Sequence, residues 1–515
     1  MFKTLWSRIK GVLHSMGFIK GIAKVTDIQG TTVSDEMYQA IDRWLCLYQG
    51  NVESFSWSSR PKLVWKVQED GKSARVLRTL NLPKLIAQEM AQLTFNEKFV
   101  LNISDERIQS FIDETFKMNK FGTRMQEHFE VMYATGGVAV EAYVEGGAVR
   151  LNYIHANSFY PIAWDSSGKV SEAVIISDDF VQGNERYRLL RWHVWEKVGD
   201  QKLYTIRNRL YKADRNDKDD IGIEVSLDSV PRYADVEAVI SIQGLKNPLF
   251  AYTKPATKNN VDITSPLGIS LFANAIDTIH TIDYVFDSFE NEFSMGKKRI
   301  LASEQVLETV DEKGQLVTRF NADTSVYTPL NFGDTDTPIK EIDFSLRVEE
   351  HLSAINGLLE TLSAQIGFSS GTFTFDGQSV KTATEIISEK SKTYRTKQTN
   401  EVNSIEPFIR DIVAMILDVA TAAGLIPPPG DYEINVAFDD SIAEDKKATT
   451  ELQILRVGAG LQSKLDAIML LDRLDEEAAR EKLRRIQEEE RAVMTRDPLM
   501  SGIGEGLDDA DTDPV

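Results

Sequence analysis

The sequence contains a single cysteine, Cys46, among its 515 residues. One cysteine cannot form an intrachain disulfide, so the sequence excludes a disulfide-stapled fold and suits a reducing compartment. Cys46 lies in a helical pattern rich in tryptophan and leucine. This setting indicates that Cys46 packs against other side chains.

Long apolar runs are also missing. No stretch reaches the roughly 18 consecutive apolar residues that a membrane-spanning helix needs, so no membrane partner is expected. The N-terminus carries lysines and arginines, but without an uninterrupted apolar segment and a convincing cleavage site we expect no signal peptide. Its apolar residues recur at helical spacing, which favours a packing or subunit-contact arm over a helix on a membrane surface. These residues are Leu5, Ile9, Leu13 and Met16.

Positive charge is in short supply. The chain has 58 lysines and arginines against 79 aspartates and glutamates, a formal net charge of -21. A protein that coats duplex DNA needs a basic surface to neutralise phosphates, so this balance argues against that class. This charge balance does not exclude a protein that encloses nucleic acid without binding it tightly. The length allows two to four domains, and the 42% hydrophobic content is typical of a globular protein.

Motifs for catalysis are absent as well. The six histidines show no metal-ligand spacing, and the sequence has no H-E-x-x-H, C-x-x-C, G-x-S-x-G or P-loop motif. We therefore expect no enzyme activity, no cofactor and no metal site. One alternative stays open, a metal-dependent nuclease using Asp439, Asp440 and Glu444. An exposed acidic loop is the interpretation that we favour for these residues.

Two heptad patterns are the most regular features of the chain. Ser265 and Pro266 predict a helix start, and the apolar residues behind them are spaced alternately by three and four up to Gly296. Such a helix would be roughly 42 Å long at 1.5 Å per residue. Its seam residues are Phe272, Ala275, Ile279, Ile282, Phe286, Phe289 and Phe293.

The second heptad pattern begins at Ser345 and ends at Gly367. Short β runs lie between the two helices, in 297–344. The arrangement fits either a helical hairpin buried in one globule or a protruding stem built by neighbouring subunits. The seam residues of the second helix are Val348, Leu352, Ile355, Leu359, Leu362 and Ile366.

A glycine- and hydroxyl-rich loop, GFSSGTFTFDGQSVK, follows the second helix. The capping box at Thr382 then predicts a helix that runs toward Gly424, and Pro407 should kink it. Before the first heptad, helical and strand-like patterns predict an α+β domain over residues 1 to about 260. After a strand at YEINVAF, further helices are expected to about residue 494, followed by an acidic tail that we expect to be disordered.

This order of parts resembles that of tailed-bacteriophage portal proteins. Several stretches look like portal proteins of siphophages that infect Gram-positive hosts, and the resemblance covers about residues 30 to 490. They are IDRWLCLYQG, TLNLPKLIAQEMAQLTFNE, ATGGVAVEAYV, SPLGISLFANAIDTI and TATEIISEKSKTY. The resemblance implies a wing at 1–264, a first stem helix at 265–296, a clip at 297–344, a second stem helix at 345–366, a tunnel loop at 367–381, a kinked helix and wing return at 382–440, a crown at 441–494 and the acidic tail at 495–515.

The resemblance further implies a homo-oligomeric ring, typically of twelve subunits, at one capsid vertex of the virion, assembled in the host cytoplasm. Double-stranded DNA would enter through the ring during packaging and leave through it during ejection. The implied partners are the terminase large subunit, a head–tail adaptor, and the major capsid and scaffolding proteins. The alternative is another head-completion or scaffold-like assembly protein, which needs no central opening.

The resemblance also assigns roles to individual residues. The heptad seams would form the subunit interface of the stem, and the loop would line the DNA channel. Basic residues at Lys390, Lys392, Arg395 and Lys397 would face either a subunit interface or the channel. The interface set is Phe272, Ile279, Ile282, Phe286, Ile355, Leu359 and Leu362, and the channel set is Ser369, Ser370, Thr372, Thr374, Gln378 and Lys381.

Overall fold

The computed structural model describes most of the chain and divides it into two units. The first unit ends at Asp439 and the second begins at Asp440. The described residues are 28–56, 63–69, 73–95, 99–215, 221–296, 299–303, 308–312, 315–319, 327–330, 339–342, 345–374, 383–438, 446–472 and 476–494.

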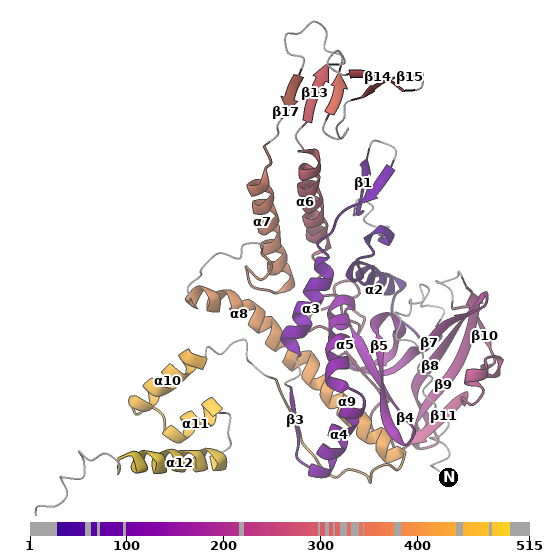
Figure 1. Ribbon diagram of the computed structural model, residues 1–515. Helices are drawn as coiled ribbons and strands as arrows, with labels where there is room; N and C mark the ends of the chain where they lie inside the picture. Colours follow the sequence, from indigo (N-terminus) through magenta and orange to yellow (C-terminus); the bar gives the residue numbers. More distant parts are fainter. Residues whose placement is uncertain are drawn as a thin grey trace, which may run out of the picture. The chain divides into compact units, whose positions relative to one another are not determined.

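The first unit combines helices with mainly antiparallel sheets, which confirms the predicted α+β class (Figure 1). Its helices are α2 (Asp35–Tyr48), α3 (Leu82–Thr94), α4 (Glu106–Met118), α5 (Phe121–Thr135), α6 (Ile276–Met295), α7 (Val348–Ile366), α8 (Ala383–Asn400) and α9 (Glu406–Ala422). Its strands up to the first of the long helices are β1 (Lys66–Glu69), β2 (Ser73–Val76), β3 (Val100–Ile103), β4 (Val138–Glu145), β5 (Ala148–His155), β6 (Phe159–Trp164), β7 (Val170–Gln182), β8 (Glu185–Val198), β9 (Gln201–Asp214), β10 (Ile223–Val225), β11 (Val239–Gln243) and β12 (Phe250–Thr253).

In the sheets of this unit, most paired strands are consecutive in the sequence. The largest has the order β10-β9-β8-β7-β6, and β11 also pairs with β9. A second sheet has the order β12-β4-β5. Near the end of the unit, β18 (Ile434–Ala437) returns to pair with β3, with Ile434 opposite Ile103. This pairing joins the C-terminal end of the first unit to a strand in its N-terminal half.

Helix α9 lies at the centre of the hydrophobic core. Most of its side chains are buried, and it packs against β12, β4, β5 and β18. Strand β4 is buried along nearly its whole length because α5 and α9 both contact it. Burial on more than one side explains why β4 is apolar over most of its length, whereas α9 is amphipathic and keeps Arg410 exposed.

Local signals set where several of the helices begin and end. The Asp105 carboxylate accepts hydrogen bonds from the backbone N–H groups of Arg107 and Ile108, which caps the start of α4. Gly136 ends α5 with a φ of 90°, and a Cβ there would lie 2.6 Å from the carbonyl oxygen of Gly268. Only glycine fits this left-handed, tightly packed position.

The first long helix is shorter than the sequence pattern predicts. It begins at Ile276, not at Ser265, and Phe272 and Ala275 precede it. The segment from Ser265 instead packs against the end of α5, where Leu271 N–H donates to the carbonyl of Tyr133 over 2.9 Å. Tertiary hydrogen bonds thus satisfy backbone groups that a helix would otherwise pair internally.

A small β module connects the two long helices, as the short β runs predict (Figure 1). One sheet has the order β16-β13-β17, with β13 and β16 parallel, and β14 and β15 form a separate hairpin. The second long helix starts at Val348, three residues after the predicted start at Ser345. The strands are β13 (Arg299–Ser303), β14 (Glu308–Glu312), β15 (Gln315–Arg319), β16 (Tyr327–Leu330) and β17 (Ile339–Ile342).

The second unit consists of helices α10 (Lys446–Gly458), α11 (Lys464–Asp472) and α12 (Glu476–Met494). Helix α11 contacts both α10 and α12. These helices agree with the helical stretches expected before residue 494, whereas the acidic tail lies outside the described residues. Every helix in the described part of the chain is too short or too polar to cross a bilayer.

Candidate functional site

The two long helices α6 and α7 pack side by side below the β module (Figure 1). Glu292 joins them where the module is inserted. Its carboxylate accepts hydrogen bonds from the Arg347 backbone N–H at 3.0 Å and from the Arg347 guanidinium at 3.1 and 3.2 Å. Nε2 of His351 lies 2.6 Å from the same carboxylate. The hydrogen bonds from Arg347 lower the pKa of Glu292 to about 2, so Glu292 stays charged and holds the helix pair closed.

Helix α6 is attached to the N-terminal part of the unit through two buried aspartates. The carboxylate of Asp283 accepts from Trp65 Nε1 at 2.8 Å and from Leu80 N–H at 3.0 Å. The Asp287 carboxylate accepts hydrogen bonds from both terminal guanidinium nitrogens of Arg75, at 2.5 and 2.8 Å. Burial raises the pKa of Asp283, whereas the hydrogen bonds from Arg75 lower that of Asp287.

These contacts link α6 to the helix that packs on the rest of the unit. The chain runs from Leu80 directly into α3, which contacts α5 and α8. The sequence patterns did not predict a role for either aspartate, although their positions provide a signal. Asp283 and Asp287 lie four residues apart, so they share one face of α6, next to its apolar seam.

The predicted subunit-interface residues are mostly buried inside their own chain, which corrects that prediction. Phe272, Ile279 and Ile282 are fully buried, and Ile355, Leu359 and Leu362 are no more than 3% exposed. All six belong to one hydrophobic cluster of the first unit. A side chain without exposed surface cannot contact another subunit. Among the seven predicted residues, Phe286 alone is half-buried.

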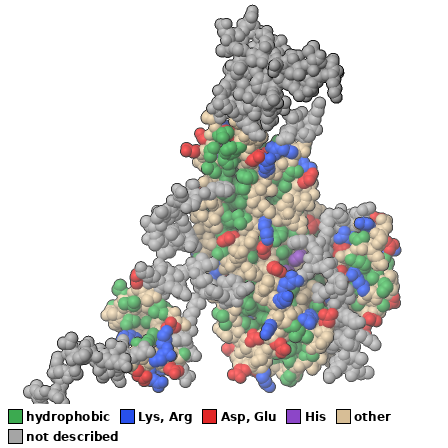
Figure 2. All heavy atoms as spheres, viewed as in Figure 1, with side chains coloured by type: hydrophobic (Ala, Val, Ile, Leu, Met, Phe, Trp, Pro, Cys, Tyr) green, Lys and Arg blue, Asp and Glu red, His purple; other side chains and the backbone are tan. Residues whose placement is uncertain are grey.

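Other apolar side chains on the helix pair remain exposed. Tyr284 is 56% exposed and Phe293 is 46% exposed, both on α6. Leu346, just before α7, is 39% exposed. Figure 2 shows hydrophobic side chains over this part of the molecule. These three residues, unlike the buried seam, present apolar surface to solvent.

The beginning of the predicted tunnel loop is a tight, anchored turn. Gly367 has a φ of 86°, and its carbonyl accepts from Thr396 Oγ1 at 2.8 Å. Ser369 N–H donates to Thr393 Oγ1, also at 2.8 Å. The buried rings of Phe368 and Phe373 meet edge to face with centroids 5.2 Å apart.

The turn divides the predicted channel residues. Ser369 is buried, so its predicted place on the channel wall is wrong, and its hydrogen bonds to α8 give the reason. Ser370, Thr372 and Thr374 are exposed, as a channel role requires. Gln378 and Lys381 lie outside the described residues.

Helix α8 continues into α9 through a π-helical segment, Glu401–Ile405. Pro407 lies in the first turn of α9, so the helical hydrogen-bond pattern changes next to the proline that sequence analysis singled out. Of the basic cluster on α8, Lys397 is only 1% exposed and forms an ion pair with Glu401 at 3.1 Å. Lys392 Nζ donates to the carbonyl of Ala364, and the Arg395 side chain is exposed. The side chain of Lys390 is outside the described set.

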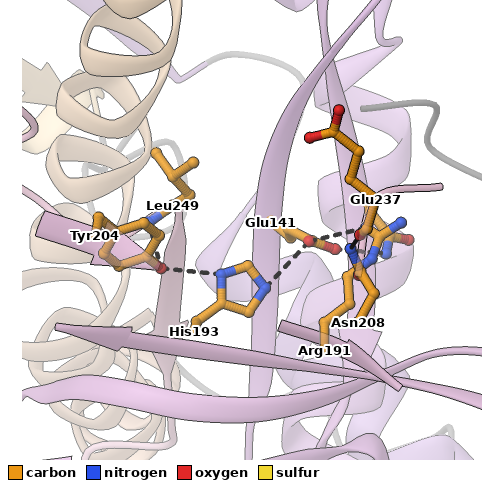
Figure 3. A network of polar contacts seen from close by, with 8 residues as sticks. Glu141, Arg191, His193, Tyr204, Asn208, Glu237 and Leu249 are labelled. Carbon is orange, nitrogen blue, oxygen red and sulfur yellow. Dashed lines mark hydrogen bonds and ion pairs between the residues drawn. The ribbon is translucent and has the colours of Figure 1, made fainter. Parts of the chain in front are cut away.

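A buried polar network crosses the sheets of the first unit (Figure 3). Glu141 on β4 pairs with Arg191 at 3.0 Å and lies 3.2 Å from Nε2 of His193. Nδ1 of His193 is 2.9 Å from the hydroxyl of Tyr204, which also accepts from the backbone N–H of Leu249. Burial would raise the pKa of Glu141, but Arg191 and His193 hold it at about 2.

The network is placed to join strands and not to meet a substrate. Glu141, His193 and Tyr204 are each no more than 2% exposed. They connect β4 to β8 and β9, two strands of the other sheet. This network was not predicted from the sequence, although a glutamate within the apolar run VAVEAYV is a signal for it.

The described residues contain no group of three or more histidine, cysteine, aspartate or glutamate side chains arranged to hold a metal ion. The residues of the nuclease alternative, Asp439, Asp440 and Glu444, lie outside the described set. That alternative therefore gains no structural support here.

Comparison with family models decides the family. The model for phage portal proteins of the SPP1 Gp6-like type matches residues 31–495. The chain belongs to the phage portal protein family. Comparison with curated proteins gave no match. Membership confirms the resemblance inferred from the order of parts, and the portal protein family is structural rather than typically enzymatic.

Proposed function

We propose that this portal protein forms a ring at one capsid vertex and serves as the DNA channel for genome packaging, head–tail connection and DNA ejection. The observation that carries the proposal is the family match over residues 31–495. It spans the sheets, the helix pair with its β module, the helix α8–α9 and the second unit. We infer twelve subunits, the number typical of the family.

The surface chemistry of the chain supports this role. Exposed apolar residues at Tyr284, Phe293 and Leu346 provide contact area on the helix pair for a neighbouring subunit. The net charge of -21 per chain gives an acidic ring, which holds few phosphates and lets duplex DNA slide. The family identity and the charge together favour a conduit over a tight DNA-binding protein.

The channel role centres on the segment after α7. Exposed Ser370, Thr372 and Thr374 follow the anchored Ser369, and Lys381 follows in the sequence. In a ring each copy would contribute one Lys381, giving a ring of positive charge that contacts phosphates transiently. Each solvent-exposed contact contributes about 1 kcal/mol or less, so DNA is slowed without being trapped.

We assign the partners by the order of parts. The β module between α6 and α7 faces the terminase large subunit during packaging and the head–tail adaptor afterwards. The second unit lies inside the capsid, where the scaffolding and major capsid proteins surround it during assembly. Crosslinks from terminase to residues 440–494, in place of residues 297–344, would reverse this assignment.

Electron microscopy of the purified full-length chain tests the proposal most directly. We expect class averages of rings with a central opening, and native mass spectrometry at micromolar concentration should give a single closed oligomer. Only monomers and dimers in the mass spectrum would contradict the ring. Closed particles without an opening would point to the alternative, another head-completion or scaffold-like assembly protein.

A further inference from the structure

The first 26 residues carry a charge opposite to that of the rest of the chain. They contain five lysines and arginines and no aspartate or glutamate, so their formal charge is +5. The whole chain has a formal charge of -21, which leaves -26 for residues 27–515. We call residues 1–26 the basic arm. Its charged residues are Lys3, Arg8, Lys10, Lys20 and Lys24.

The large apolar residues of the basic arm recur with a helical period. Successive residues of an α-helix are rotated by about 100°, so those between positions 2 and 16 would share an arc of about 120°. Lys3, Arg8 and Lys10 fall outside this arc. Aromatic and aliphatic residues on one side and basic residues on the other are typical of a helix that lies in a membrane interface. The residues of the arc are Phe2, Leu5, Trp6, Ile9, Val12, Leu13 and Met16.

The described part of the chain begins where the arm joins the large sheet. Ile28 is only 1% exposed. The carbonyl of Gln29 accepts from Trp192 Nε1 at 3.0 Å, and Oε1 of Gln29 accepts from Arg209 at 3.3 Å. Gly30 then turns the chain with a φ of 92°. The arm is therefore attached at a fixed point, on the face of β8 and β9 that carries Trp192 and Arg209.

Three carboxylates on this face already have arginine partners. Arg207 lies opposite Trp192 in the pairing of β8 with β9, which places its side chain on the same face as the attachment point. A basic arm laid on this face would meet arginines without gaining a counter-charge, because their carboxylates are taken. This arrangement weighs against the packing arm that the sequence pattern favoured. The pairs are Asp179 with Arg186, Glu196 with Arg207, and Glu224 with Arg209.

The partner of the arm has to match both kinds of residue. Duplex DNA supplies phosphates for the lysines and arginines but leaves the seven apolar side chains in water. An apolar protein groove covers the apolar side chains but supplies no anions unless it is also acidic. The interface of an anionic bilayer supplies both, with acyl chains directly beneath negatively charged headgroups. Among these surfaces, the bilayer interface fits the pattern best.

We propose that the basic arm binds the surface of a membrane containing anionic phospholipids, with its apolar arc among the acyl chains and its basic residues at the headgroups. This inference goes beyond the proposed channel function, which gives the arm no role. A single chain suffices for binding. In the proposed ring the arms of all subunits would bind one membrane together, so rings should dissociate from it far more slowly than single chains.

Co-sedimentation of the purified full-length chain with lipid vesicles tests the inference. We expect binding to vesicles of phosphatidylcholine and phosphatidylglycerol to be at least about tenfold stronger than to phosphatidylcholine alone, and to weaken with salt. Ile9→Glu should weaken it about fiftyfold or more, because it places a charge in the apolar arc. Ser7→Glu is the matched control. It adds the same charge outside the arc and should weaken binding about fivefold or less.

Quenching by brominated lipids gives a second readout. The quenched part of the tryptophan fluorescence should largely disappear in Trp6→Phe, which shows that the arc enters the acyl region. Equal weakening by Ile9→Glu and Ser7→Glu, or equal binding to both kinds of vesicle, would contradict the inference. Binding of the arm to a short DNA duplex without binding to vesicles would make it a nucleic-acid contact instead. Rings seen by microscopy in any of these cases leave the proposed function standing, and vesicle binding by single chains would support the inference even without rings.

Discussion

Individual side chains on the helix pair differ in what covers them. Ile279 and Ile282 of α6 are fully buried by their own chain, whereas Tyr284, two residues further, is 56% exposed. Substitutions at the two kinds of position should therefore have different consequences. The same distinction separates Lys397, which is buried beside Glu401, from the exposed Arg395.

We predict that Ile282→Asp unfolds the protomer, because it places an unpaired charge in the core. The expected loss of stability exceeds about 4 kcal/mol. Thermal unfolding followed by circular dichroism measures it. Tyr284→Asp is the matched control, since it should change the stability of the protomer by less than about 0.5 kcal/mol while weakening the ring. Equal loss of folding in both variants would contradict the assignment of Tyr284 to the subunit surface.

Buried His128 and half-buried His155 should make the first unit sensitive to acid. Burial lowers the pKa of His128 to about 3, helped by nearby His155, and burial lowers that of His155 to about 4. Both pKa values lie below the usual 6.5, so the unfolded chain binds protons that the folded chain excludes. Their contribution is complete above about pH 6.5 and is lost as the pH falls toward 4 and 3, by up to about 1.4 kcal/mol per histidine per pH unit.

The measurement is the unfolding midpoint between pH 7 and pH 4. His128→Gln should flatten its pH dependence, because glutamine can replace the donor to the Ala139 carbonyl without titrating. Unchanged pH dependence in this variant would show that His128 does not control the acid response.

Polar contacts hold the helix pair and the turn that follows it in place. Glu292 closes α6 against α7, Asp283 and Asp287 attach α6 to the N-terminal segment, and Gly367 lets the chain turn onto α8. Glu292 and Gly367 act near helix ends, whereas Asp283 and Asp287 lie in the middle of α6, so the orientation of α6 depends on polar contacts in its middle as well as near its end. Gly357, within α7, and Gly367, at its C-cap, show how local backbone geometry affects stability.

We predict opposite effects for alanine at these glycines. Gly367→Ala should destabilise the protein by about 1–2 kcal/mol, because φ is 86° and a Cβ would lie 2.8 Å from Thr396 Oγ1. Gly357→Ala lies within α7 with open space around its Cβ and should stabilise by about 0.5–1 kcal/mol. Chemical denaturation compares the two. A gain in stability from Gly367→Ala would contradict the anchored turn.

The contact between α6 and the N-terminal segment can be tested in the same way. Asp287→Ala leaves the Arg75 guanidinium without its carboxylate, so we expect faster hydrogen exchange and proteolysis in residues 63–80. Ser288→Ala, at an exposed position of the same helix, should leave both rates unchanged. Equal rates in all three proteins would show that Asp287 does not hold the segment.

The whole chain is acidic, with a net charge of -21, which in the proposed ring would disfavour tight binding of DNA. Weak and salt-sensitive DNA contact is expected, without sequence preference and without nucleotide hydrolysis. Nanomolar, salt-resistant binding to one sequence, or ATPase activity that survives purification to homogeneity, would contradict this expectation.

We predict that Lys381→Glu leaves rings intact and mildly lowers the amount of DNA packaged or retained, because it reverses one ring of positive charge. Deletion of residues 375–380 should have a stronger effect, and it spares the buried Phe373 and Ser369, which anchor the turn. Lys246→Glu, at an exposed position outside this region, is the control. Full-length DNA packaged and held at the normal rate in the deletion variant would show that this segment is no channel element.

The sequence determined the order of parts, the acidic charge and the family. Heptad spacing located α6 and α7, and the turn signals between them indicated the β module, because these features depend on neighbours a few residues apart. The resemblance to portal proteins was carried by several stretches in the right order, and the family match over residues 31–495 confirmed it.

Only the tertiary structure decided which surface covers each face of a helix. Periodicity shows which residues share a side of a helix, but not whether the covering surface belongs to the same chain or to another. Thus the seam at Ile279 and Ile282 was expected at a subunit interface and is buried internally. Ser369 was expected in the channel and is bonded to Thr393, and α6 starts late because Leu271 bonds to Tyr133. Each of these outcomes depends on partners far away in the sequence, which only folding brings into contact.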